Sequence, residues 1–175
     1  MKLLNVTSPP PVTSITPQFL KTIQDHFFVG QTGLLSFGGS IVAWGGLFNP
    51  LNSGVNVVIN DTTLSDLGVN AFTADLYLGS VPPGRKITSS LTTATNLSLP
   101  LAKPKAKLKF NPAVRGVPQG GTFAFIRRVE TDTTQVIDVS GRIILPPGGT
   151  FFALLKTQVF TQSRIGFAWW EERIK

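Results

Sequence analysis

The sequence predicts an all-β protein: an antiparallel β-sandwich of the jelly-roll or Greek-key type, preceded by an extended N-terminal arm. About ten short segments have the apolar alternation or the β-branched and aromatic content of strands. Turn residues separate these segments at intervals of about 8–12 residues, and the chain has 17 glycines and 13 prolines to supply them. Hardly any segment has helical periodicity. A sandwich of short strands is the fold class that combines these features.

The arm is expected at residues 1–18 and the sandwich domain at residues 19–175. Pro9, Pro10 and Pro11 favour a polyproline II conformation and cannot lie in an interior strand. The apolar side chains of the arm are Leu3, Leu4, Val6, Val12 and Ile15. They are too few for a core of their own, but they could lie along a neighbouring subunit. Addition of the arm to a sheet edge of that subunit and a free tail are both open interpretations.

A short helical turn is expected at 19–25, and strands follow it. The expected strands are roughly 26–30, 33–37, 41–44, 55–60, 71–78, 103–110, 122–129, 135–139, 142–145, 149–159 and 163–171. Glycine pairs at 38–39 and 45–46 predict breaks between strands. Residues 80–101 are rich in Pro, Thr and Ser, which predicts a long surface loop across one end of the sandwich.

Two short phrases recur in the sequence. Phe48-Asn49-Pro50 with Gly54-Val55 returns as Phe110-Asn111-Pro112 with Gly116-Val117, and Val81-Pro82-Pro83-Gly84 returns as Leu145-Pro146-Pro147-Gly148. Both phrases are turn-forming sequences. Two similar halves would suit a jelly roll, which consists of two Greek keys. Chance recurrence in a chain rich in proline and glycine is the alternative.

The C-terminal hairpin carries two strands that are apolar on both faces. Phe152 and Leu154 lie on the opposite face from their apolar neighbours, and Trp169 and Trp170 point to opposite sides. A strand of this kind must be covered twice, once by its own core and once by a second sheet, an arm or another subunit. At most one of the two tryptophans is expected in the intramolecular core. We therefore expect Trp170, or Phe152 and Leu154, to be buried by another chain.

Composition argues for a structural role. Only 14% of the residues are charged and 42% are hydrophobic, so the surface must present many Thr, Ser, Asn and Gln side chains. Such surfaces are typical of shells and fibres and are uncommon in metabolic enzymes. A chain of this length buries about 70% of its unfolded surface, so its stability requires no cofactor or disulfide. The absence of cysteine leaves the redox compartment open.

The net charge of +7 is concentrated between Asp75 and Glu130, where no acidic residue occurs. In this segment lysine occupies every second position of one strand, at Lys103, Lys105, Lys107 and Lys109. These lysines suit an anionic polymer, or else they form a solvated strand face that protects a sheet edge from aggregation. Aromatic residues do not alternate with them, so nucleic acid is not an expected partner.

No recognisable catalytic or metal site is present in the sequence. His26 is the only histidine, and no serine lies in a G-x-S-x-G elbow. The glycine pairs lack the Lys-Ser/Thr ending of a phosphate-binding loop. Without cysteine, a metal would depend on Asp61, Asp66 and Asp75, which lack the spacing of a calcium loop. We therefore expect neither an enzyme nor a cofactor.

The N-terminal residues also bear on localisation. Their apolar run of two leucines is far shorter than the core of a signal peptide. No window approaches the ~18 apolar residues of a membrane span. Synthesis in the cytoplasm without a signal peptide, and no membrane partner, are the expectations.

Several phrases of the chain support a family resemblance. They are Phe28-Val29-Gly30-Gln31-Thr32, Ala43-Trp44-Gly45-Gly46-Leu47-Phe48-Asn49-Pro50, Asn52-Ser53-Gly54-Val55-Asn56, Pro82-Pro83-Gly84 and Gly166-Phe167-Ala168-Trp169-Trp170-Glu171-Glu172. They resemble an uncharacterised family of small proteins from spore-forming Firmicutes. The plan of an arm before a Gly- and Pro-punctuated jelly roll is also similar to endospore appendage subunits, which polymerise by arm insertion and are reinforced by disulfides. Without cysteine, this chain would polymerise through non-covalent contacts.

The leading hypothesis is a structural subunit that self-assembles into a fibre or surface layer through its arm and strand edges. The resemblance places it on the spore surface or in an extracellular fibre, with other copies of itself and other spore-surface proteins as partners. One alternative is a β-sandwich module that binds carbohydrate through an exposed tryptophan, or an anionic polymer through the lysines. The other is a phage-virion decoration protein.

Overall fold

The computed structural model describes residues 14–174, which contain one helix and twelve strands. In chain order they are α1 (Pro17–Ile23), β1 (Phe27–Gln31), β2 (Leu35–Phe37), β3 (Val42–Phe48), β4 (Val55–Asp66), β5 (Phe72–Leu78), β6 (Ile87–Thr88), β7 (Thr92–Ala94), β8 (Lys107–Val114), β9 (Thr122–Val129), β10 (Thr134–Leu145), β11 (Thr150–Lys156) and β12 (Thr161–Arg173). Helix α1 begins inside the segment predicted as the arm, because Thr16 caps it and Pro17 occupies its first turn.

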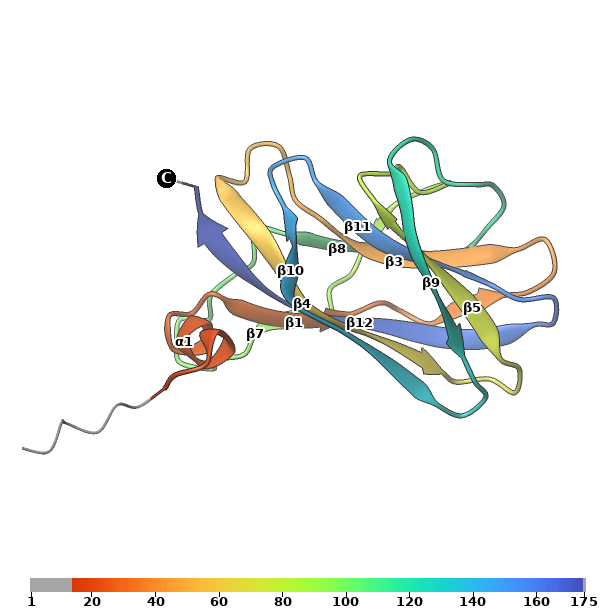
Figure 1. Cartoon of the computed structure of the whole chain (residues 1–175), viewed down its shortest axis with the longest axis horizontal. Helices are drawn as coiled ribbons and strands as arrows, with labels where there is room; N and C mark the ends of the chain where they lie inside the picture. Colours follow the sequence, from red (N-terminus) through yellow and green to blue (C-terminus); the bar gives the residue numbers. More distant parts are fainter. Residues whose placement is uncertain (1–13, 175) are drawn as a thin grey trace, which may run out of the picture.

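The strands form two six-stranded antiparallel sheets that pack face to face (Figure 1). Sheet I has the order β10-β4-β12-β1-β7, and β2 pairs with the beginning of β12. Sheet II has the order β6-β8-β3-β11-β5-β9. The predicted all-β antiparallel sandwich is therefore confirmed. The chain passes repeatedly from one sheet to the other, which supports jelly-roll connections, although that finer assignment stays a prediction.

The main core lies between the sheets and takes alternate residues from the central strands. β12 contributes Phe167 and Trp169, and β11 contributes Phe151 and Leu155. The rings of Phe151 and Phe167 meet edge to face, with centroids 6.3 Å apart. Since these side chains come from the last two strands, the C-terminal hairpin supplies the centre of both sheets.

A second apolar cluster lies on the outer face of sheet II. It contains Trp44, Phe48, Phe152 and Leu154. The Trp44 ring lies 6.1 Å from that of Phe152, and its Nε1 donates a hydrogen bond of 2.8 Å to the carbonyl oxygen of Pro83. The connection that contains Pro83 therefore lies over this outer face and covers it.

A smaller cluster covers the outer face of sheet I. Trp170 stacks on Phe27 with ring centroids 6.2 Å apart, and Val58 and Ala168 complete the group. Gly141 of β10 lies against the indole, since a Cβ at this position would be 2.5 Å from its Cη2 atom. A side chain at residue 141 would displace the ring, so glycine lets β10 pack over it.

The prediction that another chain buries Phe152, Leu154 and Trp170 is wrong. Their exposed fractions within a single copy are 0%, 4% and 7%. The two-faced apolar pattern did indicate double burial, but the second layer comes from this chain's own connections and from β10. Trp169 and Trp170 face opposite sides, as predicted, and both are buried.

The glycine pair at 45–46 does not break a strand, because β3 runs through it. A Cβ on Gly46 would lie 2.3 Å from the Cβ of Phe152 and 2.4 Å from the carbonyl oxygen of Phe151. Glycine is needed here for the close approach of β3 and β11, rather than for a turn.

The two sides of the sandwich differ. On one side, β6 extends sheet II and β7 extends sheet I. Both strands belong to residues 80–101, which were predicted as a loop across one end of the sandwich. This segment instead crosses from one sheet to the other. At the crossing, the Ser89 hydroxyl donates to the Gln31 carbonyl over 2.7 Å, and the Gln31 N–H donates to the Leu91 carbonyl over 3.0 Å. The main chain therefore closes this side. On the opposite side, sheet II ends at β9 and sheet I ends at β10.

Candidate assembly surface

The side of the sandwich formed by β9 and β10 is left open, and we name it the open edge (Figure 1). Among the described strands, β9 pairs only with β5, and β10 pairs only with β4. Each strand therefore has a row of backbone N–H and C=O groups without a strand partner. Rows of this kind are templates for pairing with another chain.

Most side chains of β9 are exposed, although Val129 is buried and Phe125 packs against the main core. Phe123 is 53% exposed although its ring contacts that of Tyr77, with centroids 5.4 Å apart. Ile126 is 50% exposed. On β10, Val136 and Ile144 are more than half exposed. Phe123 and Ile126 both lie on the outer face of β9, because they pair with Tyr77 and Asp75 of β5. An ordered edge strand with half-exposed apolar side chains is the feature expected of a contact surface.

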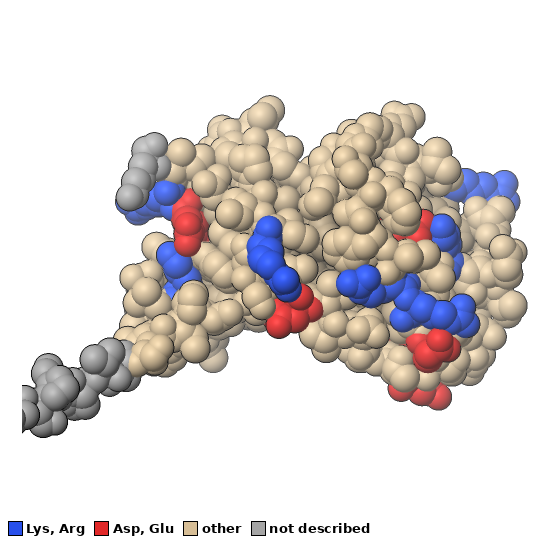
Figure 2. Space-filling model, viewed as in Figure 1, with Lys and Arg blue, Asp and Glu red and all other residues tan. Residues whose placement is uncertain are grey.

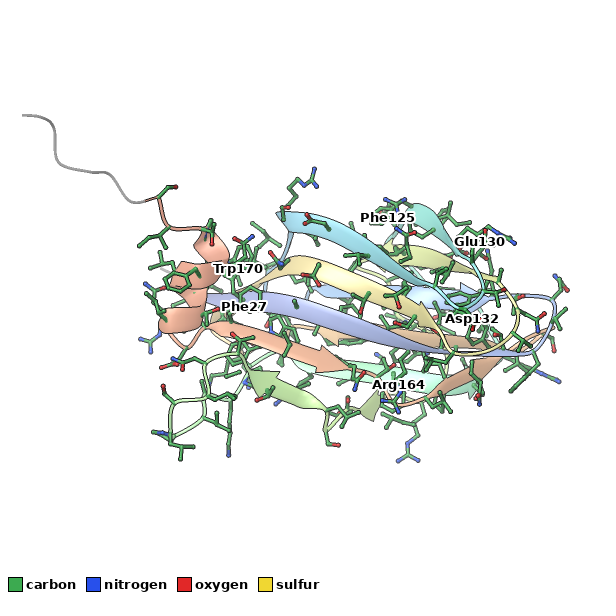
Figure 3. The ribbon with its side chains drawn as sticks, turned by 90° about the horizontal axis from the view of Figure 1, so that it is seen from below. Phe27, Phe125, Glu130, Asp132, Arg164 and Trp170 are labelled. Atoms are coloured by element: carbon green, nitrogen blue, oxygen red, sulfur yellow. The ribbon has the colours of Figure 1, made fainter. Side chains whose placement is uncertain are left out.

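The open edge is electrically neutral, although the chain carries +7. Residues 122–145 contain three arginines and three carboxylates. Arg128 pairs with Glu130 at 2.8 Å, and the Arg127 guanidinium lies 4.8 Å from the Phe125 ring centroid. Figure 2 shows basic and acidic groups next to one another, on a face that is mostly uncharged, and Figure 3 shows Phe125 and Glu130 along β9. Two copies of this surface can therefore meet without net repulsion.

A β-bulge interrupts β10. Its register with β4 shifts between Asp138 and Ile143, and Ser140 and Gly141 have positive φ angles. The Asp138 carboxylate accepts hydrogen bonds from the Ser140 N–H and hydroxyl, which lowers the Asp138 pKa. A bulge prevents continuous pairing with a further strand. The uninterrupted backbone of Phe125–Val129 in β9 makes that strand the better partner for a second chain.

Helix α1 presents a second exposed apolar surface, which we name the helix face. Its residues are Ile15, Phe19, Leu20 and Ile23, all between 39% and 56% exposed. Of the apolar residues predicted to make the arm's contacts, Ile15 is exposed, whereas Leu3, Leu4, Val6 and Val12 lie outside the described residues. The opposite side of α1 is fixed to the sandwich by Gln18, which donates to Asn60 over 3.0 Å.

Glu172 also holds α1 in place, which predicts a pH dependence. Its carboxylate accepts a hydrogen bond from Trp170 Nε1 (3.0 Å) and pairs with Lys21 (3.1 Å), and both contacts lower the Glu172 pKa below 4.5. Such a group stabilises the fold above its unfolded pKa and loses this effect as the pH falls through its folded pKa. We expect amide hydrogen exchange in α1 to accelerate below about pH 4.5. NMR should show a higher Glu172 pKa in Trp170→Phe; an unchanged titration would contradict this assignment.

Comparison with protein families identifies the chain at the family level. A model described as a family of unknown function (DUF6143) matches residues 2–175. The chain belongs to the DUF6143 family. Comparisons with curated proteins and with solved structures found no match. The matched range includes the open edge and the helix face of this DUF6143 chain, while the resemblance to endospore appendage subunits stays a prediction.

The four predicted polyanion-binding lysines of this DUF6143 chain lie away from the open edge. Lys107 and Lys109 belong to β8, and Lys103 and Lys105 lie in the irregular segment before it. That segment is held by Glu171, whose buried carboxylate accepts the backbone N–H groups of Lys105 and Ala106 over 3.0 and 2.8 Å. The strand predicted at 103–110 therefore begins only at Lys107, and Lys103 and Lys105 instead line a cavity beside Glu171.

A catalytic arrangement is not found among the described residues of the DUF6143 chain. His26 lies at a cavity of about 270 Å³ with Asp25 and Glu171. No serine lines this cavity, and Glu171 is already occupied by backbone donors. Residues 14–174 contain no group of three or more His, Cys, Asp or Glu able to hold a metal ion. In the same range, no helix has the length and apolar character needed to cross a membrane.

Proposed function

We propose that this DUF6143 protein is a structural subunit that self-associates through the open edge and builds a fibre or surface layer. One observation carries the proposal: β9 is an ordered edge strand, yet its outer face carries half-exposed Phe123 and Ile126. Burial of such side chains contributes about 25 cal/mol per Å² of apolar surface. The resemblance to proteins of spore-forming Firmicutes supports the spore surface as its location.

The contact that we propose joins β9 of one copy to β9 of a second copy in antiparallel order. Such a pair is isologous, so each copy uses the same surface. With the twofold axis at Ile126, Arg127 of one copy lies opposite Phe125 of the other. This register separates the arginines of the two copies and places cations beside aromatic rings. The neutral charge of the open edge favours the same arrangement.

Growth beyond a pair requires a second contact, for which we propose the helix face. In a closed twofold pair, the free edge of β9 has a strand partner, but α1 of each subunit stays exposed. Contacts between these helix faces would link pairs into a chain or a layer. Phe19 and Ile23 are four residues apart and share one side of the helix, and Ile15 lies just before the cap Thr16.

Replacement of Ile126 by lysine tests the proposed pair. Because the side chain is half exposed, the folded subunit should retain its thermal stability, whereas a charge buried at the contact should weaken self-association at least about tenfold. Sedimentation velocity over a range of concentrations measures the effect. The matched control is Val69→Lys, which places the same charge at an 80% exposed apolar loop position and should leave association unchanged.

A second variant, Phe19→Lys, separates the two contacts in the same experiment. It should stop growth at the pair, and negative-stain electron microscopy should then show no fibre or layer. A wild-type protein that stays monomeric at the highest concentrations would overturn the proposal. Equal weakening by Ile126→Lys and Val69→Lys would also overturn it, since the effect would then follow from charge alone.

A further inference from the structure

We propose that the β8 side of sheet II binds a linear acidic polysaccharide. The binding surface, which we name the basic strip, consists of Lys86, Lys103, Lys105, Lys107 and Lys109. Ala106 and Leu108 are buried, so the lysines on either side of them point outward. Alternate residues of an extended chain lie roughly 7 Å apart. On β8, Lys107 and Lys109 are alternate residues and share one face, and Lys103 and Lys105 add cations from the irregular segment before the strand.

These cations have no partner within the described part of the chain. None of the five lysines has a carboxylate within 4.0 Å, whereas Lys21, Arg128 and Lys156 are paired. The sequence between Asp75 and Glu130 has no acidic residue. Glu171, which contacts this segment, directs its carboxylate to backbone N–H groups. The lysines repel one another, and this repulsion is relieved when an anionic chain lies along the strip.

Lys86, which precedes β6, and Lys109 of β8 both lie over the ring of Phe48. Lys86 Nζ lies 5.4 Å from the centroid of Phe48, and Lys109 Nζ lies 5.5 Å from it. Lys107 is directly paired with Phe48 in the β3–β8 ladder. Lys86 therefore adds a cation beside the row on β8 and makes the strip wider than a single strand.

The same ring helps to define the class of ligand. Phe48 is 8% exposed and both lysines lie over it, so its face is not available for stacking on a nucleobase. Single-stranded nucleic acid is normally bound by exposed aromatic side chains within a basic groove. Lysines on flexible stems act as point charges and suit carboxylate or sulfate groups repeated along a chain. These features favour an acidic polysaccharide over nucleic acid.

The inference does not rest on the proposed assembly. β8 and β9 lie at opposite sides of sheet II, separated by β3, β11 and β5. A contact through β9 therefore leaves the basic strip exposed, and an assembled fibre would present the strip repeatedly. Repeated strips would raise the avidity for a long polymer without a new contact.

Titration with heparin, used as the acidic polysaccharide, tests the proposal in the full chain. Lys107→Glu should weaken heparin binding by about tenfold and make its salt dependence shallower. Arg164→Glu is the matched control, because it changes the net charge equally and Arg164 belongs to β12 of sheet I. Circular dichroism checks that both variants fold, and Lys107→Gln should give a smaller loss in the same direction.

Three outcomes would overturn the proposal. The first is no retention of the wild-type protein by heparin at low salt. The second is an equal loss in Lys107→Glu and Arg164→Glu, which would assign binding to net charge rather than to the strip. The third is tighter binding of single-stranded DNA than of heparin, with the same dependence on Lys107, which would assign the strip to nucleic acid.

Discussion

Replacement of Trp44 by alanine is expected to lower the free energy of unfolding by about 3–5 kcal/mol. Trp44 is fully buried on the outer face of sheet II, where its ring meets Phe48 and Phe152. Alanine would leave a cavity in this cluster and remove the hydrogen bond to the Pro83 carbonyl. Thermal and urea unfolding measure the change, and a melting temperature lower by roughly 10 °C is expected for a chain of this size.

Two further variants separate the causes of this loss. Trp44→Phe keeps a ring but removes the Nε1 donor, so it should cost about 1–3 kcal/mol, less than alanine. Leu51→Ala, at an apolar position that is 84% exposed, should stay within about 0.5 kcal/mol of the wild type. A cost below about 1 kcal/mol for Trp44→Ala would contradict the burial of the outer cluster within a single copy.

Glu171→Ala is expected to destabilise the fold by about 2–4 kcal/mol. The Glu171 carboxylate is buried and accepts the backbone N–H groups of Lys105 and Ala106. Alanine would remove the acceptor of both donors, of which the Ala106 N–H is buried. Glu171→Gln retains one side-chain acceptor oxygen and should lose about half as much. Equilibrium unfolding measures the change, and hydrogen exchange at the two amides reports it locally.

The neighbouring glutamate provides the matched control. Glu172 is adjacent in β12, points to the opposite face, and has a side chain that is 46% exposed. Because the Glu172 carboxylate is partly solvated, its pair with Lys21 is weak and Glu172→Ala should cost less than about 1 kcal/mol. Equal losses in the two alanine variants would show that charge near the end of β12, rather than the two backbone hydrogen bonds, determines stability.

Local pattern predicted most strands well. β9 coincides with its predicted range of 122–129, and β5 differs from the predicted 71–78 by one residue. Alternating side chains and flanking turn residues are local features, so one sequence reveals them. β10 was expected as two strands, 135–139 and 142–145, because Ser140 and Gly141 have the composition of a turn. They form a bulge inside one strand, since β4 pairs with residues on both sides of them.

The recurring phrases also have a structural counterpart. Asn49 and Asn111 are both buried, and each donates its side-chain amide to a carbonyl that adjoins a Pro-Pro-Gly turn: Leu145 in the first case and Arg85 in the second. The first Asn-Pro phrase therefore lies against the second Pro-Pro-Gly phrase, and the second Asn-Pro phrase lies against the first. The pattern predicted turns, but these pairings depend on which strands become neighbours.

The sequence did not reveal the open edge, for a related reason. Residues 122–129 predicted a strand, but whether a strand lies at an edge follows from the strand order. Its only local sign is that Phe125, Ile126 and Arg127 mix apolar and charged groups without a clean alternation. The sequence also could not show that Pro83 covers Trp44, because they are 39 residues apart. Period-two alternation does hold for Lys107 and Lys109 of β8, whereas Lys103 and Lys105 of the predicted strand lie in an irregular segment.

The position of β12 has a consequence for biosynthesis. β12 lies between β4 and β1 in sheet I, although residues 67–160 separate it from β4 in the sequence and β1 lies still earlier. While the ribosome translates residues 67–160, β1 and β4 have no central strand to join them, and their apolar faces stay accessible to chaperones or to other nascent chains. Sheet I can form only after β12 has left the exit tunnel. Folding of sheet I is therefore expected to be slow, as contacts over such long sequence separations require.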